Sequence, residues 1–187
     1  GAAPMIHEAL TVGLRGKTGH VPTEGGPISV IVVRSAAEAA GHIAEWQALA
    51  ERTADANVFY EPWCFLPALE RFGDGKDTCL LFLYQTNILG ARLAAVFPLE
   101  RRQTFHGLPL RHLVAWRHPH LFLAQPLVDP RVSVQAWRQF LHWARQDKAW
   151  FVDFPEMVAS SQCSAALQAA AGRRCHAVES FERTILL

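Results

Sequence analysis

The fold is decided by the stretch CLLFLYQTNILGARLAAVFPL, residues 79–99. Two apolar runs, 79–84 and 88–99, are separated by three polar residues that end in Asn87. The length and polarity of this connection predict a β-hairpin with Asn87 in its turn. A further extended segment, about 110–116, would continue an antiparallel meander.

The segments before the hairpin predict one strand and two helices. The run 28–34 is rich in β-branched residues, which is typical of a buried strand. The range 35–52 opens with a Ser-x-x-Glu capping box and then places apolar residues at helical spacing. A second helix is expected over about 61–73, because it opens with Glu-Pro and closes with glycine.

The segments after the meander predict two further helices, each followed by a strand. Ser133 would cap the first helix, and the apolar run 149–154 would form a buried strand. Ser160 or Ser161 would open the second helix, and the segment 177–187 reads as extended. This order of elements predicts an α/β (α+β) fold with a mixed, largely antiparallel sheet and helices on both faces.

The chain of 187 residues, half of them hydrophobic, is long enough for one domain. Residues 1–27 lack periodicity and are expected to form a flexible arm, so that the domain comprises 28–187. The chain stops in an apolar stretch, 184–187, inside a predicted strand. We therefore expect the native polypeptide to continue.

Composition excludes several classes of protein. The 18 Lys and Arg nearly balance the 17 Asp and Glu, so no basic surface for nucleic acid is expected. The apolar runs fall far short of the ~18 to 20 residues that span a bilayer. The N-terminus does not resemble a secretion signal, and we expect a cytoplasmic protein. The four cysteines lack CxxC spacing and are interpreted as reduced packing residues.

Four short segments carry a family resemblance: FYEPW at 59–63, LPALE at 66–70, WRHPH at 116–120 and PLVDP at 126–130. Together they resemble the GNAT-superfamily acetyltransferases associated with bacterial cellulose and exopolysaccharide biosynthesis. Those proteins are similar in architecture to the Fem-type peptidyltransferases. The resemblance extends over about residues 28–187.

The resemblance implies a GNAT-like domain that is the first of two in tandem. The cofactor would be acetyl-CoA or another acyl-CoA, held mainly by the second domain. The partners would be a small-molecule or saccharide-related acceptor, and a second GNAT-like domain or a homodimer partner. In this chain only acceptor-side residues are then expected.

The residues at the expected donor site argue against tight binding of acyl-CoA by this domain alone. A pyrophosphate needs exposed backbone amides at a glycine-rich turn that leads into a helix. The junction 128–133 contains no glycine, Pro130 lacks an amide hydrogen, and Asp129 would repel phosphate. Only Arg131 is a candidate for contact with the cofactor.

Two residues are candidates for the base that takes a proton from the acceptor, Glu61 and His118. The alternative for Glu61 is a carboxylate at a helix start, which the helix dipole favours. His118 and His120 could instead belong to a polar loop or, with other ligands, bind zinc. No HExxH motif or suitably spaced carboxylate completes a metal site, so no metal is expected.

The remaining candidates would contact the acceptor: Tyr60, Trp63, Trp116, His120 and Asp129. The three aromatic residues lie beside polar loop residues and could stack on a sugar or peptide, or else pack in the core. Asp129 precedes a proline and could equally be a turn residue.

Three functional hypotheses follow. The first is a GNAT-type acyltransferase in which this chain supplies the acceptor side. The second is a non-catalytic GNAT-like module that binds a ligand or a second copy of itself. The third, a histidine-based metal hydrolase, would need bound metal. Hydrolase, kinase and dehydrogenase signatures such as a nucleophile elbow, a P-loop or a GxGxxG turn are absent from the sequence.

Overall fold

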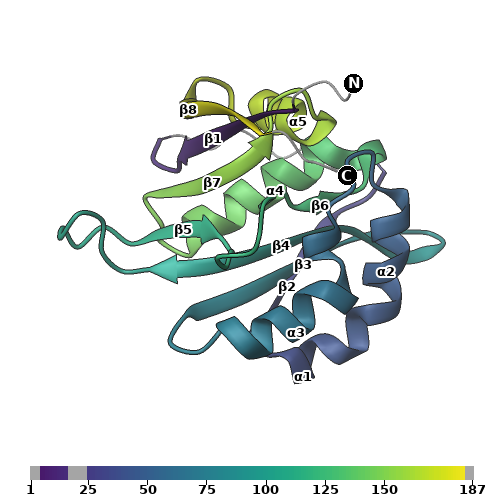
Figure 1. The fold of residues 1–187 in the computed structure, drawn as a ribbon. Coiled ribbons are helices and arrows are strands. Elements are labelled where there is room, and N and C mark those ends of the chain that lie inside the picture. The colour runs from purple at the N-terminus through teal and green to yellow at the C-terminus, as the bar shows by residue number, and fades with distance from the viewer. Residues whose placement is uncertain (1–4, 17–24, 184–187) are drawn as a thin grey trace.

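The computed structural model describes residues 5–16 and 25–183, which form one mixed sheet with helices against it (Figure 1). The strand order is β2-β3-β4-β5-β7-β1-β8, and the short β6 pairs with β4. All pairs are antiparallel except β5 with β7. The strands are β1 (Met5–Gly13), β2 (Ile28–Val33), β3 (Asp77–Asn87), β4 (Gly90–Arg102), β5 (His112–Ala115), β6 (Leu127–Val128), β7 (Phe151–Val158) and β8 (Cys175–Arg183). The helices are α1 (Ala36–Ala39), α2 (Ile43–Arg52), α3 (Pro62–Phe72), α4 (Ser133–Gln146) and α5 (Gln162–Ala171).

The predicted hairpin forms the centre of the sheet, but its turn lies at Ile88 and Leu89 and not at the predicted polar residues 85–87, which belong to β3. β3 and β4 pair from Asp77↔Arg101 to Asn87↔Gly90, and β5 continues the meander as predicted. Residues 79–83 and 93–99 are buried throughout. Strands buried on both faces have continuous apolar runs rather than alternating ones, and this explains why the sequence signal was so clear here.

Helices cover this half of the sheet on both faces, which confirms the predicted fold class. On one face the ring of Trp46 from α2 meets Phe82 edge-on, with ring centroids 5.4 Å apart. On the other face Phe140 of α4 stacks on Phe97 at 4.2 Å. The predicted helix 35–52 begins with Ser35 as its N-cap but is divided into α1 and α2 by a 3-10 turn, Ala40–His42, that contains Gly41.

The expected flexible arm is corrected by the structure, because residues 5–13 of that arm form β1. This strand lies between β7 and β8 and pairs antiparallel with both. Leu10 and Val12 bury their side chains, and Leu14 follows at the same spacing. The rest of the expected arm that falls on residues 1–4 and 17–24 lies outside the described residues, as does the predicted end of the last strand at 184–187.

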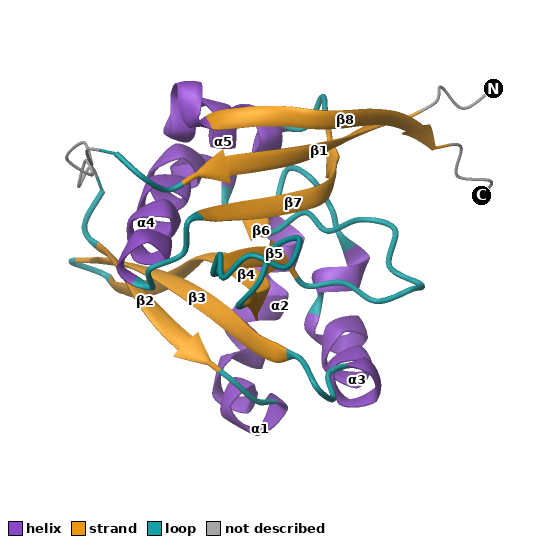
Figure 2. Ribbon diagram, turned by 90° about the vertical axis from the view of Figure 1, so that its left-hand side faces the viewer, coloured by secondary structure: helices purple, strands orange, loops and turns teal. Residues whose placement is uncertain are grey.

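The half of the sheet formed by β5, β7, β1 and β8 is covered on one face only. Phe154 of β7 packs against Trp137 of α4, and Glu8 of β1 accepts a hydrogen bond from Ser164 of α5. Helices α1 to α3 lie on the opposite side but pack beneath β2 to β4 (Figure 2). In the described part of the chain no helix packs over this second face of β7, β1 and β8, which we call the open face.

None of the helices in the described residues has the length and apolar character needed to cross a membrane. All four cysteines are free thiols, and Cys79 and Cys163 are buried, in agreement with a packing role.

Candidate functional site

The two predicted bases lie at opposite ends of α3. Glu61 is the N-cap of this 11-residue helix, whereas His118 stacks on Phe72 at its last turn, with ring centroids 4.7 Å apart. At a rise of about 1.5 Å per residue the two ends are ~16 Å apart. Glu61 and His118 therefore cannot act on the same acceptor atom in this arrangement.

Tyr60 and Trp116 are core residues. Both side chains are fully buried, and the Tyr60 hydroxyl donates a hydrogen bond of 2.6 Å to the Trp116 carbonyl. The Trp116 indole donates to the Thr78 hydroxyl at 3.1 Å. Burial raises the pKa of Tyr60 well above its ordinary value. Neither ring presents a face to a ligand, so both residues pack in the core and do not line an acceptor site.

Trp63 is exposed at the start of α3, with 62% of its surface accessible. Its indole donates a 2.6 Å hydrogen bond to the Glu61 carboxylate. The two residues form a local pair on the surface, which fits the reading of Glu61 as a helix-start carboxylate.

His118 and His120 form a small polar loop against α3. The backbone amide of His120 donates to Nδ1 of His118 at 3.3 Å. Partial burial, with the nearby positive charges of His120 and Lys76, lowers the pKa of His118. Residues 5–16 and 25–183 contain no group of three metal-ligating side chains around these histidines or elsewhere.

Asp129 is a buried ion-pair centre. Its carboxylate lies 3.3 Å from Arg52, 3.6 Å from Arg92 and 3.3 Å from Arg131. It also accepts a hydrogen bond from the Arg131 amide, which caps the 3-10 turn Pro130–Val132 before α4. The carboxylate thus occupies the amide that a phosphate would need at this turn.

A second place where an acyl donor such as acyl-CoA could bind would be the gap where β5 and β7 diverge. The two parallel strands pair only at Leu113↔Val152 and Val114↔Asp153. Beyond this point the chain's own segment 121–126 fills the gap. The Ala124 amide donates to the Glu156 carbonyl at 2.9 Å, and the Gln125 side chain accepts from the Val158 amide at 3.1 Å.

Asn57 holds this segment from the other side. Its side-chain amide donates to the carbonyls of Leu123 and Gln125 at 3.2 and 2.7 Å. An extended ligand could pair with the diverging strand edges only if this segment left. The gap is therefore closed in the folded protein.

The open face carries a concavity of about 620 Å³, which we call the sheet hollow. Drug-sized ligands occupy sites of this size, with mostly apolar walls and few polar groups. Apolar walls come from β1, β5, β7, β8 and the β4–β5 connection, and two arginines lie at the rim. The lining comprises Ala9, Leu10, Thr11, Gly13, Arg102, Phe105, Val114, Arg117, Phe151, Asp153, Pro155, His176 and Val178.

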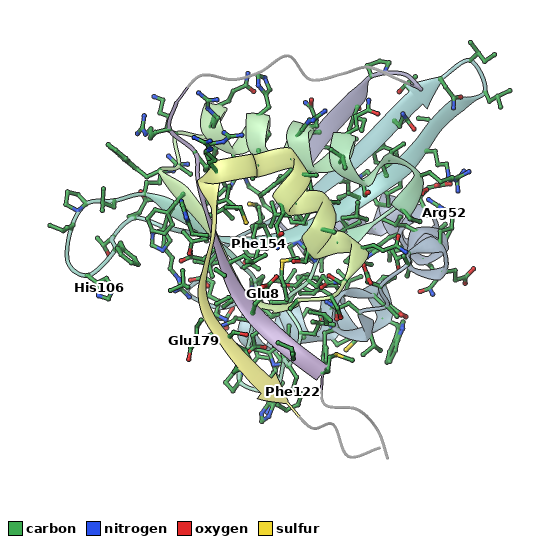
Figure 3. The ribbon with its side chains drawn as sticks, turned by 90° about the horizontal axis from the view of Figure 1, so that it is seen from above. Glu8, Arg52, His106, Phe122, Phe154 and Glu179 are labelled. Carbon is green, nitrogen blue, oxygen red and sulfur yellow. The ribbon has the colours of Figure 1, made fainter. Side chains whose placement is uncertain are left out.

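A polar row crosses the sheet hollow. Thr11 is the register partner of both Asp153 on β7 and His176 on β8, so the three side chains share one face. The Thr11 hydroxyl donates a 2.6 Å hydrogen bond to Oδ1 of Asp153. Phe154, the next residue of β7, points to the helices instead (Figure 3).

Asp153 is the carboxyl in this row, and it lacks a cationic partner. In the described ranges no Lys, Arg or His nitrogen lies within ion-pair distance of its carboxylate. Burial raises the pKa of Asp153, although the Thr11 hydrogen bond and the charges of His112 and Arg102 oppose the shift. A carboxyl whose pKa is raised binds a proton more readily than an ordinary aspartate.

The rim arginines are already paired. Arg102 makes two hydrogen bonds of 3.2 Å to Glu100, and Arg117 lies 3.8 Å from Glu156. Both arginine side chains are nearly half exposed. They can contact a polar part of a ligand whose apolar part lies against Phe105 and Phe151.

The residues of the sheet hollow were not predicted from the sequence. One signal was present, because Asp153 is a charged residue inside the apolar run 149–154. Thr11 and His176 could not be linked to it, since β1 was not predicted.

Comparison with known proteins yields no family model and no curated protein that matches the chain. The function proposed below therefore rests on the residues of this chain and on the resemblance described above.

Proposed function

We propose that this chain is the acceptor-side unit of a GNAT-type acyltransferase and that the acceptor binds in the sheet hollow. The observation that carries the proposal is Asp153, a partly buried carboxyl of raised pKa that accepts a hydrogen bond from Thr11 in an apolar concavity of ligand size. The acyl donor would be acetyl-CoA or another acyl-CoA. The acceptor class, saccharide-related or from the cell envelope, is taken from the resemblance.

In this reaction Asp153 acts as the base. Its carboxylate takes the proton from an acceptor hydroxyl or amine, and the freed lone pair attacks the thioester carbonyl of acyl-CoA. The C–S bond then breaks, and CoA leaves as a thiolate that picks up a proton. The Thr11 hydroxyl fixes Oδ1, so that Oδ2 is the oxygen turned to the acceptor.

The donor would be bound mainly outside this chain, by a second GNAT-like domain or a homodimer partner. Two features support this division. Asp129 takes the amide at the start of α4, and segment 121–126 fills the gap between β5 and β7. We place the unit in the cytoplasm, where its thiols stay reduced.

The second candidate is a non-catalytic GNAT-like module that binds a ligand or pairs with another copy. It is favoured by the same two features, the amide occupied by Asp129 and the gap filled by segment 121–126. A stable dimer in light scattering, together with ligand binding but no acyl transfer on addition of any donor domain, would favour this module over the transferase.

The test is a nuclear magnetic resonance titration of the labelled 187-residue chain with cellobiose, and separately with acetyl-CoA with desulfo-CoA as control. We expect cellobiose to shift the amide signals of Thr11, Val114 and Asp153 in a saturable way, and Asp153→Asn to weaken this binding by about tenfold. Glu51→Gln, an exposed carboxylate on α2, is the matched control and should change nothing.

Two outcomes would contradict the proposal. Micromolar binding of acetyl-CoA to the isolated chain would show a complete donor site. It would contradict the proposal that a second unit binds the acyl donor. Cellobiose shifts that avoid the sheet hollow altogether would remove it as the acceptor site.

A further inference from the structure

The β3–β4 turn projects from the body of the molecule (Figure 1). It carries two large exposed aliphatic side chains. Ile88 and Leu89 connect the strands, and they are exposed to 101% and 91%. The flanking residues set the turn: Asn87 accepts a 2.8 Å hydrogen bond from the Leu89 amide, and Gly90 adopts a positive φ of 122°. The turn geometry therefore does not require aliphatic residues at its two central positions.

Aliphatic residues at this place are unfavourable in water. Asn, Gly and Asp are the residues that short hairpin turns favour. Transfer of a side chain such as Ile or Leu into apolar surroundings is favourable by roughly tenfold to a hundredfold in partition. A surface that buried the side chains of Ile88 and Leu89 together would gain this favourable factor for each of them.

A basic concavity lies beside the end of this hairpin that carries the turn. It measures about 590 Å³ and is lined by Gln85 of β3 and by Arg131 and Arg138 at the start of α4. The described lining holds no carboxylate. Arg131 is bound to Asp129 together with Arg52 and Arg92, so three guanidinium groups surround one buried carboxylate.

The local charge therefore has an excess of cations. Arg52, Arg92 and Arg131 share the single carboxylate of Asp129, which neutralises only one of their three positive charges. Arg92 and Arg131 keep 42% and 61% of their side chains exposed. An anionic surface would complement this region, whereas a neutral one would not.

We propose that the hairpin tip and the basic concavity together bind the surface of a membrane that contains anionic lipids. Ile88 and Leu89 enter the boundary between headgroups and acyl chains, and Arg131 and Arg138 meet the headgroup phosphates. An apolar insertion beside a basic surface is the combination that peripheral membrane binding requires. This surface is independent of the sheet hollow and of the proposed acyl transfer.

The test is co-sedimentation of the full chain with vesicles of phosphatidylglycerol and phosphatidylcholine, compared with phosphatidylcholine alone. We expect binding to the anionic vesicles. The double variant Ile88→Ser with Leu89→Ser should weaken it by roughly 100-fold, and Arg138→Gln by about fivefold on anionic vesicles. The control Ile31→Ser with Ile43→Ser removes two exposed aliphatic residues elsewhere and should bind like the original chain.

Unchanged thermal unfolding of the tip variant would confirm that the fold is intact, since both side chains lie outside the core. Equal binding of the original chain and the tip variant, or no binding to anionic vesicles, would overturn the proposal. Release by inorganic phosphate, beyond that caused by chloride at equal ionic strength, would assign the concavity to a free phosphate ligand and would also overturn it.

Discussion

Two carboxylates, one in each half of the sheet, have opposite surroundings. Asp129 lies where helices cover both faces, and three arginines and a backbone amide satisfy it. Asp153 lies on the open face, where its described partner is the hydroxyl of Thr11. A buried charge is stable when it is paired and costly when it is not. The difference is the one expected if Asp129 stabilises the fold and Asp153 has the binding or chemical role proposed above.

The largest effect is expected at Asp129. Asp129→Ala leaves three guanidinium groups without their shared carboxylate and uncaps the turn before α4. We expect the free energy of unfolding to fall by about 3 kcal/mol, measured by urea denaturation. Arg138→Ala, nearby on α4, serves as the control and should cost less than about 1 kcal/mol. A loss at Asp129 as small as at Arg138 would contradict the ion-pair role.

The second largest loss of stability is expected at Asn57, because this residue holds the segment that closes the gap between β5 and β7. Asn57→Ala removes the hydrogen bonds to Leu123 and Gln125 and the cap of the turn Val58–Tyr60. The buried carbonyl of Gln125 and the partly buried carbonyl of Leu123 then lose this donor, at a cost of about 2 kcal/mol. Hydrogen exchange should show faster opening at Ala124. Unchanged protection there would mean that the segment is held without Asn57.

Tyr60→Phe tests the core hydrogen bond to the Trp116 carbonyl. The variant keeps the packing of the ring against Phe65 and removes only the hydroxyl. We expect a loss of about 1 kcal/mol of unfolding free energy and no change in saccharide binding. A large loss of binding with intact stability would instead return Tyr60 to the acceptor site.

Asp153→Asn should leave stability nearly unchanged or raise it, by less than about 1 kcal/mol because the carboxyl is only partly buried. The pKa of Asp153 is raised in the folded chain, so the folded state loses stability as pH rises from the ordinary aspartate pKa through the raised one. The variant lacks this loss. Its advantage over the original chain should therefore grow with pH across that window and then level off. An advantage that shrinks with pH would mean that the folded protein stabilises the charged form.

The central half of the fold was predictable because its signals are local. The hairpin 79–99 lies in one continuous stretch, and the Ser35 cap binds the Glu38 amide only three residues away. The resemblance pointed to segments 59–63 and 116–120, which pack against each other but bury Tyr60 and Trp116. The acceptor-contacting role expected for Tyr60 and Trp116 therefore does not fit their burial in the core, which the sequence pattern alone did not reveal.

The open half could not be predicted in the same way. Thr11 and Asp153 are 142 residues apart, and β1 is stabilised by pairing with β7 and β8 rather than by its own pattern. Isolated strands of alternating residues are weak signals. A site assembled from three such strands therefore becomes visible only in the folded chain.

The most direct test of the account is a nuclear magnetic resonance titration of the side-chain carboxyl carbons in the original chain. We predict that the signal of Asp153 titrates above the ordinary pKa of aspartate, because partial burial in the sheet hollow outweighs the Thr11 hydrogen bond and the charges of His112 and Arg102. Asp153→Asn identifies the signal. A midpoint below the ordinary value would show a carboxylate held charged by a partner, and the sheet hollow would then lose its base.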